Sequence, residues 1–529
     1  MKKRFFLFSI VLFALSVHAE VHISVDDSLT WSVQQLAPYI GQTVVFDGPI
    51  VVCSNRSGLK MSPWRIFEPL CLGKLGTPEY SNAQRINSSC GFMLTGVSDY
   101  HRCGEKVYNL KAKVNSTSSL SFVSGTWQGN KRADLEANLP DLGDYRLLVC
   151  AFNLENYFMT WGSMGASSYT QHQKQRAKTS KALKKINADI FGLVELQLGN
   201  EAIEEIVNDL NQNLPQRNYQ YFKDSHSETM QKVDFVYDAN TVRPIGTPAA
   251  TDAELKYRKK MICFEEIATG EKFIYSINHF KAMNNGGESR RVNEAKAVVN
   301  LYNSYRQNGK VRDNDVLFMG DFNCYAFTDP VFVFTDNGMQ NLHRVFHHDA
   351  SYSYMYNGLA SYIDHALCNN SLLPQITGMA VYHINSDEND NYTYDGIWSD
   401  NTMFRCSDHD PVLVGLKLDS TLSGNPYFNG DTYTQDSLTF YYPYAPGEED
   451  INPLVYFDIH TINGYRICSP TKVEFYGMNE LTRRKYYTID DSNPYLPDEV
   501  KQFLPLPSGV YVLRFYYDGK VQPYKLIVR

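Results

Sequence analysis

The chain has 529 residues, more than the roughly 250–300 residues at which a single hydrophobic core stops growing, so several domains are expected. Hydrophobic residues make up 43% and charged residues 20% of the sequence, which excludes a wholly disordered chain. The formal net charge is −8, so bulk positive charge cannot hold a polyanion, and a phosphate-bearing partner must be met by a local patch or a metal ion.

The first 19 residues predict an export signal. Residues 2–4 are cationic, residues 5–17 are apolar, and residues 17–19 form a small-residue cleavage site before Glu20. The apolar run is shorter than the roughly 20 residues of a membrane span, and no other segment has the length and apolarity of one. We predict a secreted or cell-surface protein, with the periplasm as an alternative. Removal of the leader leaves 47 basic against 58 acidic side chains, a formal charge of −11.

After the leader the sequence divides into three parts. Residues 20–143 alternate short β-like runs with Ser, Asn and Gly, which predicts a small barrel or sandwich of the OB-fold kind. Residues 144–419 predict an α/β layered domain, with strands at 145–152, 189–194, 273–277 and 316–319 and helices at 171–186, 201–210 and 290–305. Residues 426–529 follow a linker, are rich in Tyr and lack helical periodicity, which predicts a β-sandwich.

Polar side chains stand directly beside five apolar strands of the middle part. They are Asn153, Glu155, Glu195, His279, Asp321, Asn323, Asp408, His409 and Asp410. A single carboxylate at a strand end is usually a solvated loop start. Five such ends meeting on one rim of a layered sheet predict a site for a hard divalent cation, because such ions prefer oxygen ligands.

Six motifs in the middle part resemble, in order and spacing, those of the endonuclease/exonuclease/phosphatase superfamily. They are Asn153-Leu-Glu-Asn156, Leu193-Val-Glu195, Asn278-His-Phe-Lys281, Gly320-Asp-Phe-Asn323, Tyr362-Ile-Asp-His365 and Ser407-Asp-His-Asp-Pro411. The match runs from about Tyr145 to Leu418, roughly half the chain. The resemblance implies a central four-layer α/β sandwich between two β-rich modules. The sequence is also similar to secreted bacterial extracellular deoxyribonucleases, which carry an exported β-module ahead of the catalytic domain.

The resemblance implies a metal site. Glu195 matches the principal Mg²⁺ ligand, Asn153 and Glu155 match residues that complete or orient the metal shell, and Asp408 lies beside the ion. Mn²⁺ is an alternative ion, and Ca²⁺ is an alternative as a structural or activating ion.

The resemblance also implies catalytic roles. Asp321 and Asn323 match the pair that positions the attacking water and holds the phosphate. His409 matches the histidine that binds or protonates at the phosphate, and Asp364 matches the carboxylate that orients it. His279 matches a second histidine, a candidate general acid for which no carboxylate partner can be assigned.

Basic and aromatic side chains supply candidates for substrate binding. Lys281, Arg290 and Arg291 surround or follow a Gly-containing turn at residues 284–287 and are expected to meet the substrate. Six further cations lie on or near one helix, as a solvated face or as a binding surface: Lys174, Arg176, Lys178, Lys181, Lys184 and Lys185. Trp64 and Phe67 of the N-terminal module belong to its core or stack on bases.

Ten cysteines fit an oxidising destination, and none shows zinc-site spacing. The motif neighbourhood that the resemblance implies makes Cys368 and Cys406 the predicted disulfide. Four more thiols permit three pairings in the N-terminal module: Cys53, Cys71, Cys90 and Cys103.

The expected function is that of a secreted, metal-dependent nuclease that cuts DNA with low sequence specificity, as an endonuclease in preference to an exonuclease. One alternative is a phosphodiesterase or phosphatase that acts on a phospholipid, sphingomyelin or an inositol phosphate. A sphingomyelinase should expose an apolar hairpin for membrane docking, and the sequence displays no obvious one. Another alternative is a non-catalytic surface binding protein, yet Glu195, Asp321 and His409 are all present.

Two expectations concern the separate modules. Residues 506–515 and 524–529 resemble the sorting tail of the type IX secretion route, which implies a partner in the secretion machinery; an ordinary terminal sandwich is the alternative. A fragment of residues 144–419 contains every motif named above and is expected to hydrolyse small phosphodiesters by itself.

Overall fold

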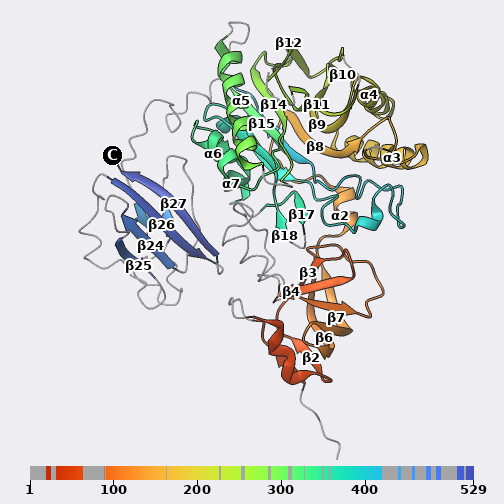
Figure 1. Cartoon of the computed structure of the whole chain (residues 1–529), viewed down its shortest axis with the longest axis vertical. Helices are drawn as coiled ribbons and strands as arrows, with labels where there is room; N and C mark the ends of the chain where they lie inside the picture. The colour runs from red at the N-terminus through yellow and green to blue at the C-terminus, as the bar shows by residue number, and fades with distance from the viewer. Residues whose placement is uncertain are drawn as a thin grey trace, which may run out of the picture.

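A computed structural model gives the arrangement of the chain (Figure 1). It describes residues 20–25, 31–63, 89, 91–419 and, further on, strands of the C-terminal part, with short gaps at 163, 226–227, 252–255, 284–286, 308–312, 327, 348–350 and 357–358. The expected leader and linker, Trp64, Phe67, Cys71 and Cys90 lie outside the described residues. No helix in the described part is long and apolar enough to cross a membrane.

The N-terminal module is a small barrel. Its strands are β1 (Val21–Ile23), β2 (Thr43–Phe46), β3 (Ile50–Ser54), β4 (Leu59–Pro63), β5 (Phe92–Thr95), β6 (Lys106–Ser116) and β7 (Ser119–Gln128). The pairings run β3–β4–β5–β7–β6 and return to β3, with β5 and β7 parallel. A short helix, η1 (Val33–Tyr39), adds Leu36 to the apolar core, and α2 (Arg132–Ala137) leads to the middle domain.

The middle domain contains two six-stranded sheets. The first has the order β10-β11-β9-β8-β21-β20, and the second has the order β12-β13-β14-β15-β19-β16. The first comprises β8 (Leu147–Tyr157), β9 (Ile190–Leu198), β10 (Tyr219–Tyr221), β11 (Glu228–Asp238), β20 (Ile376–Val381) and β21 (Val412–Leu416). The second comprises β12 (Val242–Ala250), β13 (Lys259–Glu266), β14 (Lys272–His279), β15 (Val316–Asp321), β16 (Gln340–Asn341) and β19 (Asp364–Cys368).

Helices cover the outer faces of both sheets (Figure 1). The first sheet packs against α3 (Tyr169–Ile186) and α4 (Glu201–Asn213). The second lies with α5 (Glu288–Gln307), α6 (Asp329–Thr335) and α7 (Leu342–His347). Short elements complete the domain: η3 (Lys256–Arg258), η4 (Leu373–Gln375), η5 (Asp390–Tyr392) and the hairpin of β17 (Tyr354–Tyr356) and β18 (Leu359–Ser361). The expected four-layer α/β sandwich with flanking β-rich regions is confirmed.

Side-chain alternation explains why the central strands are continuous apolar runs. In β8, Leu148, Cys150 and Phe152 pack toward the helices, whereas Leu147, Val149 and Ala151 pack into the core between the sheets. Successive side chains of a strand point to opposite faces, so a strand covered on both faces must be apolar throughout. The strands and helices expected in the middle part all occur, with boundaries that differ by a few residues.

The predicted disulfide between Cys368 and Cys406 is wrong. Both are free and buried, because Cys368 lies in the core between the two sheets, while Cys406 lies in the core between the first sheet and its helices. Cys53 and Cys103 are also free.

The C-terminal part contains a two-stranded sheet of β22 (Thr439–Tyr441) and β23 (Tyr456–Asp458) and an antiparallel sheet in the order β25-β24-β26-β27. The latter four are β24 (Lys472–Gly477), β25 (Arg484–Ile489), β26 (Gly509–Tyr517) and β27 (Lys520–Val528).

Candidate active site

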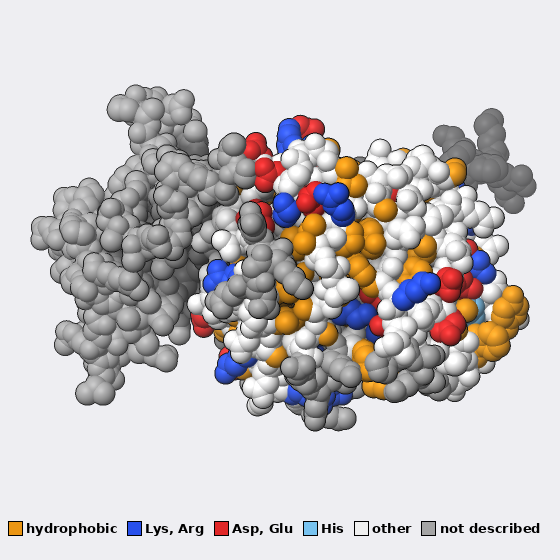
Figure 2. Space-filling view, turned by 90° about the horizontal axis from the view of Figure 1, so that it is seen from above, with side chains coloured by type: hydrophobic (Ala, Val, Ile, Leu, Met, Phe, Trp, Pro, Cys, Tyr) orange, Lys and Arg blue, Asp and Glu red, His pale blue; other side chains and the backbone are white. Residues whose placement is uncertain are grey.

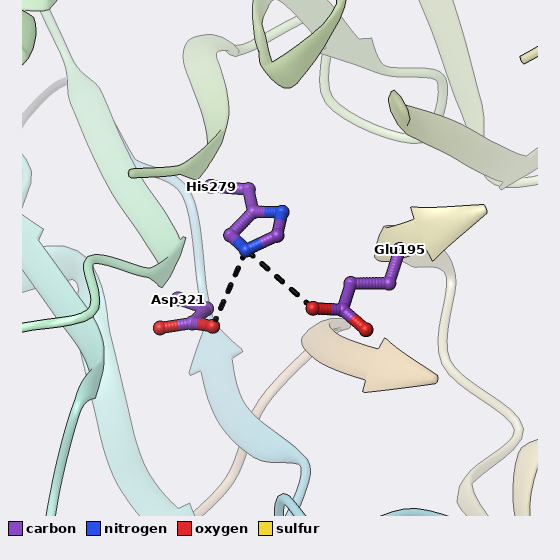
Figure 3. A group of neighbouring side chains, drawn as sticks. All are labelled: Glu195, His279 and Asp321. Carbon is purple, nitrogen blue, oxygen red and sulfur yellow. Dashed lines mark ion pairs between the residues drawn. The ribbon is translucent and has the colours of Figure 1, made fainter. Parts of the chain in front are cut away.

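Strand register places three polar residues side by side where strands β14 and β15 of the second sheet end and strand β19 begins. In the parallel pair β14–β15, His279 is opposite Asp321, and in the antiparallel pair β15–β19, Asp321 is opposite Asp364. The first sheet brings Glu195 from β9 to the same place. His279 Nε2 lies 3.6 Å from Glu195 Oε1 and 3.7 Å from Asp321 Oδ2 (Figure 3). The site therefore lies where the two sheets present their strand ends to each other.

Hydrogen bonds hold the carboxylates of this edge in fixed positions. Asn153 Nδ2 donates to Asp321 Oδ2 at 3.1 Å, and the Glu155 amide donates to Asn153 Oδ1 at 3.0 Å. Asn323 donates from its backbone to Asp321 Oδ1 at 2.7 Å and from its side chain to Oδ2 at 3.0 Å. Asn153 therefore orients the acidic residues, and Asn323 forms a unit with Asp321.

His409 and Asp364 form a buried pair. His409 Nδ1 lies 2.8 Å from Asp364 Oδ2, and Ser353 Oγ donates to the same oxygen at 2.7 Å. The other ring nitrogen, Nε2, lies 4.0 Å from Asp321 Oδ2 and 3.9 Å from Asp408 Oδ1. Asp364 thus fixes the ring, while Nε2 faces the cluster of carboxylates.

The backbone is strained where these residues lie. Among the described residues, eight non-glycine residues have positive φ, and four belong to this edge: Glu155, Asn156, Glu195 and Asn323. Such conformations cost roughly 1–3 kcal/mol each and persist only where the surroundings over-determine them. Gly320 has φ +123°, and a Cβ there would meet the Asn278 carbonyl oxygen at 2.1 Å. The Gly320-Asp321 step thus requires glycine.

Burial without full compensation raises the pKa values of the acidic residues. Burial, followed by repulsion from Asp408, raises the pKa of Glu155 to about 8. Burial likewise raises the pKa of Glu195, with Asp408 adding to the effect. Burial raises the pKa of Asp321 to about 7, although His409 acts in the opposite direction. The site therefore holds more negative charge than its own cations balance.

The two histidines have opposite electrostatic environments. Burial opposes protonation of His409, yet Asp364, Asp408 and Asp321 together raise its pKa well above the usual range. Burial and then the Arg258 guanidinium lower the pKa of His279 well below the usual range. The carboxylates around His409 thus favour its protonated form, whereas burial and Arg258 favour the neutral form of His279, which weakens the expected role of His279 as a general acid.

Arg258 is a site residue that sequence reasoning missed. Its Nε donates to His279 Nδ1 at 3.1 Å, and its Nη2 lies 2.7 Å from Nδ1 and 2.8 Å from Nε2, so the guanidinium lies against one edge of the imidazole ring. His279 Nε2 also lies near Glu195 and Asp321. Arg258 ends η3 and precedes an antiparallel strand, so it lacks the signal of a polar residue after a buried strand. Tyr394, in the loop between β20 and β21, was also missed; burial and then the charge of Glu155 raise its pKa, so it lies within electrostatic range of the same carboxylates.

The residues present fit a divalent cation. Among the described side chains, Glu155 Oε2 is buried and has no hydrogen-bond partner. Glu195, His279 and Asp321 offer ligand atoms within 4.8 Å of one another, as do Asp321, Asp364 and His409. The second group is already engaged as the His409–Asp364 pair, so the carboxylates on the Glu195 side are the better metal site. A hard cation would relieve the excess negative charge that raises the pKa values of Glu155 and Glu195.

Several cations expected to meet the substrate have partners inside the protein. Arg291 is buried and donates to the carbonyl oxygens of Lys281 and Ala282, at 3.1 and 3.3 Å, and pairs with Glu288. This places it behind the loop after β14. Arg290 is more exposed and lies 3.7 Å from Glu294. The side chain of Lys281 stays a candidate for substrate binding.

The basic helix α3 is largely engaged in internal contacts. Arg176 pairs with Glu205 and Asp209, Lys178 is buried against Asp400, and Lys181 and Lys185 donate to the carbonyl oxygens of Asn401 and Ala137. These four cations anchor neighbouring segments, so the helix is neither a uniformly solvated face nor a continuous polyanion surface.

Comparison with known proteins agrees with the motif analysis. Residues 151–409 match the model of the Endonuclease/Exonuclease/phosphatase family, and this match supports membership of that superfamily. Members of that superfamily are metal-dependent hydrolases of phosphodiesters or phosphate esters, and the middle domain is similar to them over residues 151–409. No curated protein matches the chain.

Solved structures similar to this chain include an endonuclease/exonuclease/phosphatase from Bacteroides vulgatus, at 16% identity and TM-score 0.37, covering 52% of this chain and 99% of that one. Another is a mannosyl-6-phosphatase from Bacteroides thetaiotaomicron, at 18% identity and TM-score 0.36, covering 51% and 100%. A third is the human Nocturnin catalytic domain, at 14% identity and TM-score 0.36, covering 51% and 93%.

The His409–Asp364 pair generates a first prediction. Asp364→Asn should keep the fold, slow hydrolysis and shift the alkaline limb of the pH–rate profile to lower pH. The sign follows because the Asp364 carboxylate raises the His409 pKa, so its loss deprotonates the imidazolium at lower pH. His409→Ala should cost as much or more, and the double variant little beyond that, because the two act as a unit.

The measurement is kcat/KM against pH for the two single variants and the double variant, with Asp134→Asn on the exposed side of α2 as a control. Multiplicative losses, or an unmoved alkaline limb, would show that Asp364 only supports a turn.

Arg258 generates a second prediction. Arg258→Met should lower kcat/KM by about 10–100-fold, the value of one charge-assisted hydrogen bond, because the His279 ring loses the donor that holds it in place. Arg243→Met is the matched control, since Arg243 lies on the neighbouring strand β12 with an exposed side chain paired to Glu265. Equal activity of both variants would remove Arg258 from the site.

Proposed function

We propose that this protein is a secreted, Mg²⁺-dependent nuclease that hydrolyses phosphodiester bonds within DNA with low sequence specificity. The observation that carries the proposal is the cluster of carboxylates between the sheets, where buried Asp321 and half-buried Glu155 and Glu195 lie beside the His409–Asp364 pair. Hydrolysis of a phosphodiester needs a water nucleophile, charge neutralisation on the phosphoryl oxygens and a proton for the leaving oxygen. The site has a group for each need.

The residues divide this chemistry. Glu155 and Glu195, with Asp408 beside them, would hold a divalent ion, which supplies charge neutralisation on the phosphoryl oxygens when bound. Asp321 has a pKa of about 7, which suits a base that accepts a proton from water near neutral pH. His409 Nε2 faces the same carboxylates and donates a proton or a hydrogen bond to the phosphate. Asn323 keeps Asp321 in place.

Local rather than bulk charge supports binding of a polyanion. On the face drawn in Figure 2, Lys and Arg side chains lie among Asp and Glu side chains with apolar side chains between them. Arg258 donates to His279 at the site, Arg405 interacts with Glu155 and Asp408, and Arg290 lies at the start of α5. Affinity for DNA should therefore depend on the bound ion more than on a basic surface.

The flanking modules complete the proposal. The N-terminal barrel is proposed to be OB-like, supported by its closed β3–β4–β5–β7–β6 ring and its parallel β5–β7 pair. Export by the leader at residues 1–19 and passage through the type IX route by the C-terminal part are further proposals. Their support is the charge and apolarity of the leader and the final strands of the sequence.

A metal-removal experiment tests the proposed function. Purified protein is incubated with plasmid, linear duplex, single strands, RNA and sphingomyelin vesicles, with Mg²⁺ or with EDTA. We expect nicking and linearisation of plasmid with Mg²⁺ and none with EDTA. Glu195→Ala should abolish cleavage, because it removes a proposed metal ligand. It should leave the unfolding temperature close to that of the wild type, because burial and then Asp408 disfavour the charged form of this carboxyl in the folded protein.

Glu204→Ala, on the exposed side of α4, is the control and should cleave normally. Cleavage by Glu195→Ala in EDTA would contradict the proposed metal chemistry, and cleavage of sphingomyelin without cleavage of DNA would replace the substrate.

An exposed apolar tip favours the lipid-directed alternative as a second candidate. Ile397 is 81% and Trp398 49% exposed, and both follow Tyr394, which lies beside the site carboxylates. The sequence alone displayed no such feature. An exposed aromatic can stack on a base or enter a membrane surface, whereas an exposed isoleucine contributes to a membrane surface but little to base stacking.

This difference gives a prediction that separates the two substrates. If DNA is the substrate, Trp398→Ala should raise KM by roughly 5–100-fold, the worth of one stacked base, and Ile397→Ser should have little effect. If a lipid is the substrate, both substitutions should weaken sedimentation with sphingomyelin vesicles. Steady-state kinetics on DNA and vesicle sedimentation measure the two outcomes, and equal wild-type behaviour of both variants would exclude this tip from substrate binding.

A further inference from the structure

A buried ionic contact joins the N-terminal barrel to the catalytic domain. Arg102, between β5 and β6, is 1% exposed. Its guanidinium has Nε 2.5 Å from Glu388 Oε1 and a terminal nitrogen 3.7 Å from Asp387 Oδ2, and it also donates to the carbonyl oxygen of His383. Both acidic side chains are fully buried. Removal of one partner from a buried ion pair leaves an uncompensated charge, which disturbs the groups around it.

Other barrel residues hold the same segment, residues 383–389, here called the bridge segment. Tyr100 donates to Glu388 Oε2 at 2.8 Å, and Asn130 donates to Asp387 Oδ2 at 2.7 Å. Asn55 donates to the Asp387 carbonyl oxygen at 3.0 Å. The carboxylates of the bridge segment are therefore satisfied mainly by the barrel, which lies more than 250 residues away in the sequence.

The other side of the bridge segment holds the loop that carries His409. Asn385 Nδ2 donates to the His409 carbonyl oxygen at 2.7 Å. The backbone amides of Asn385 and Ser386 donate to Asp410 Oδ1 at 2.7 and 3.0 Å. Asn385 Oδ1 accepts from the amide of Cys406 at 2.9 Å. Residues 406–410 are thus held against the bridge segment by hydrogen bonds from both its backbone and its side chains.

A second path runs from Asp387 to Asp364. Tyr352 donates to Asp387 Oδ1 at 2.9 Å, and the next residue, Ser353, donates to Asp364 Oδ2, the oxygen that faces His409 Nδ1. The hairpin that follows packs Met355 into the core of the barrel. Both members of the His409–Asp364 pair are therefore connected to the barrel through Asp387.

We propose that the N-terminal barrel is a structural part of the catalytic centre and that Arg102 is a positioning residue for His409. Arg102 pairs with Asp387 and shares Glu388 with Arg132 of α2, whose Nε donates to Glu388 Oε1 at 3.0 Å. The bridge segment then holds His409 and Asp364 in register with the metal-side carboxylates. This inference rests on the proposed hydrolytic function. It replaces the expectation that residues 144–419 suffice for hydrolysis, because that fragment would keep Asp387 and Glu388 without Arg102.

The test uses the full chain and a small chromogenic substrate, bis(p-nitrophenyl) phosphate with Mg²⁺, which needs no DNA-binding surface. Arg102→Met should lower kcat by about 10–100-fold with KM nearly unchanged, because a misplaced proton donor slows the chemical step. In the His409→Ala background, Arg102→Met should have no further effect, because its influence passes through His409. Leu120→Ala, which cuts a buried side chain from the far part of the barrel core, is the control for loss of stability.

Leu120→Ala should lower the unfolding temperature but leave kcat unchanged below that temperature. Tyr352→Phe, which removes a single hydroxyl, is the milder second variant for the case in which Arg102→Met does not fold. It should lower kcat several-fold and lose that effect in the His409→Ala background. Equal losses in both backgrounds, or an unchanged kcat, would overturn the inference.

A readout that does not depend on activity separates this inference from the proposed function. Hydrogen exchange should increase at residues 383–389 and 406–410 in Arg102→Met or Tyr352→Phe, and not in Leu120→Ala. A wild-type protein that hydrolyses no phosphodiester would refute the proposed function, whereas unchanged exchange at these residues would refute the inference whatever the activity.

Discussion

The concentration of buried negative charge between the two sheets is the constraint on which the rest of the structure depends. Glu155 and Glu195 are half-buried and Asp321 is buried at this place, and loss of hydration raises the pKa of each. Burial of a carboxylate is costly unless it is paired, hydrogen-bonded or bound to a metal. The strained backbone at Glu155 and Glu195 is held by the strands around it. The two packed sheets thus hold the carboxylates of the site close together, in an arrangement that a cation and a phosphate group would stabilise.

Some internal cations of the domain stabilise the fold, and others lie at the candidate active site. Two cations of α3, Arg176 and Lys178, form ion pairs that hold neighbouring segments in place. On α5, Arg291 donates a hydrogen bond to a backbone carbonyl oxygen of the loop after β14. Arg258 and His409 instead face the acidic edge. The sequence alone does not distinguish these two groups of cations. The spacing of a basic residue on a helix does not show whether it pairs with an aspartate of a distant loop.

Most of the fold and the core of the site could be predicted from sequence for one physical reason. Strands buried on both faces leave long apolar runs, and the first polar residue after such a run, as with Glu195, marks the edge. Arg258 does not follow an apolar run, because it comes directly before strand β13, so the sequence does not indicate that it lies at the site. The disulfide expected between Cys368 and Cys406 failed because nearness of two motifs does not reveal on which face of a sheet each thiol points.

The same limitation applies to domain boundaries. Composition separates the N-terminal module from residues 144–419, because turn-rich β-runs give way to alternating strands and helices. The ion pairs of Arg102 cross that boundary, and their partners Asp387 and Glu388 are fully buried. A charged contact at a mobile interface would be solvated and weak, whereas a buried one requires both partners to be present in fixed positions. The physical unit that carries the His409–Asp364 pair is therefore larger than the unit that its motifs define.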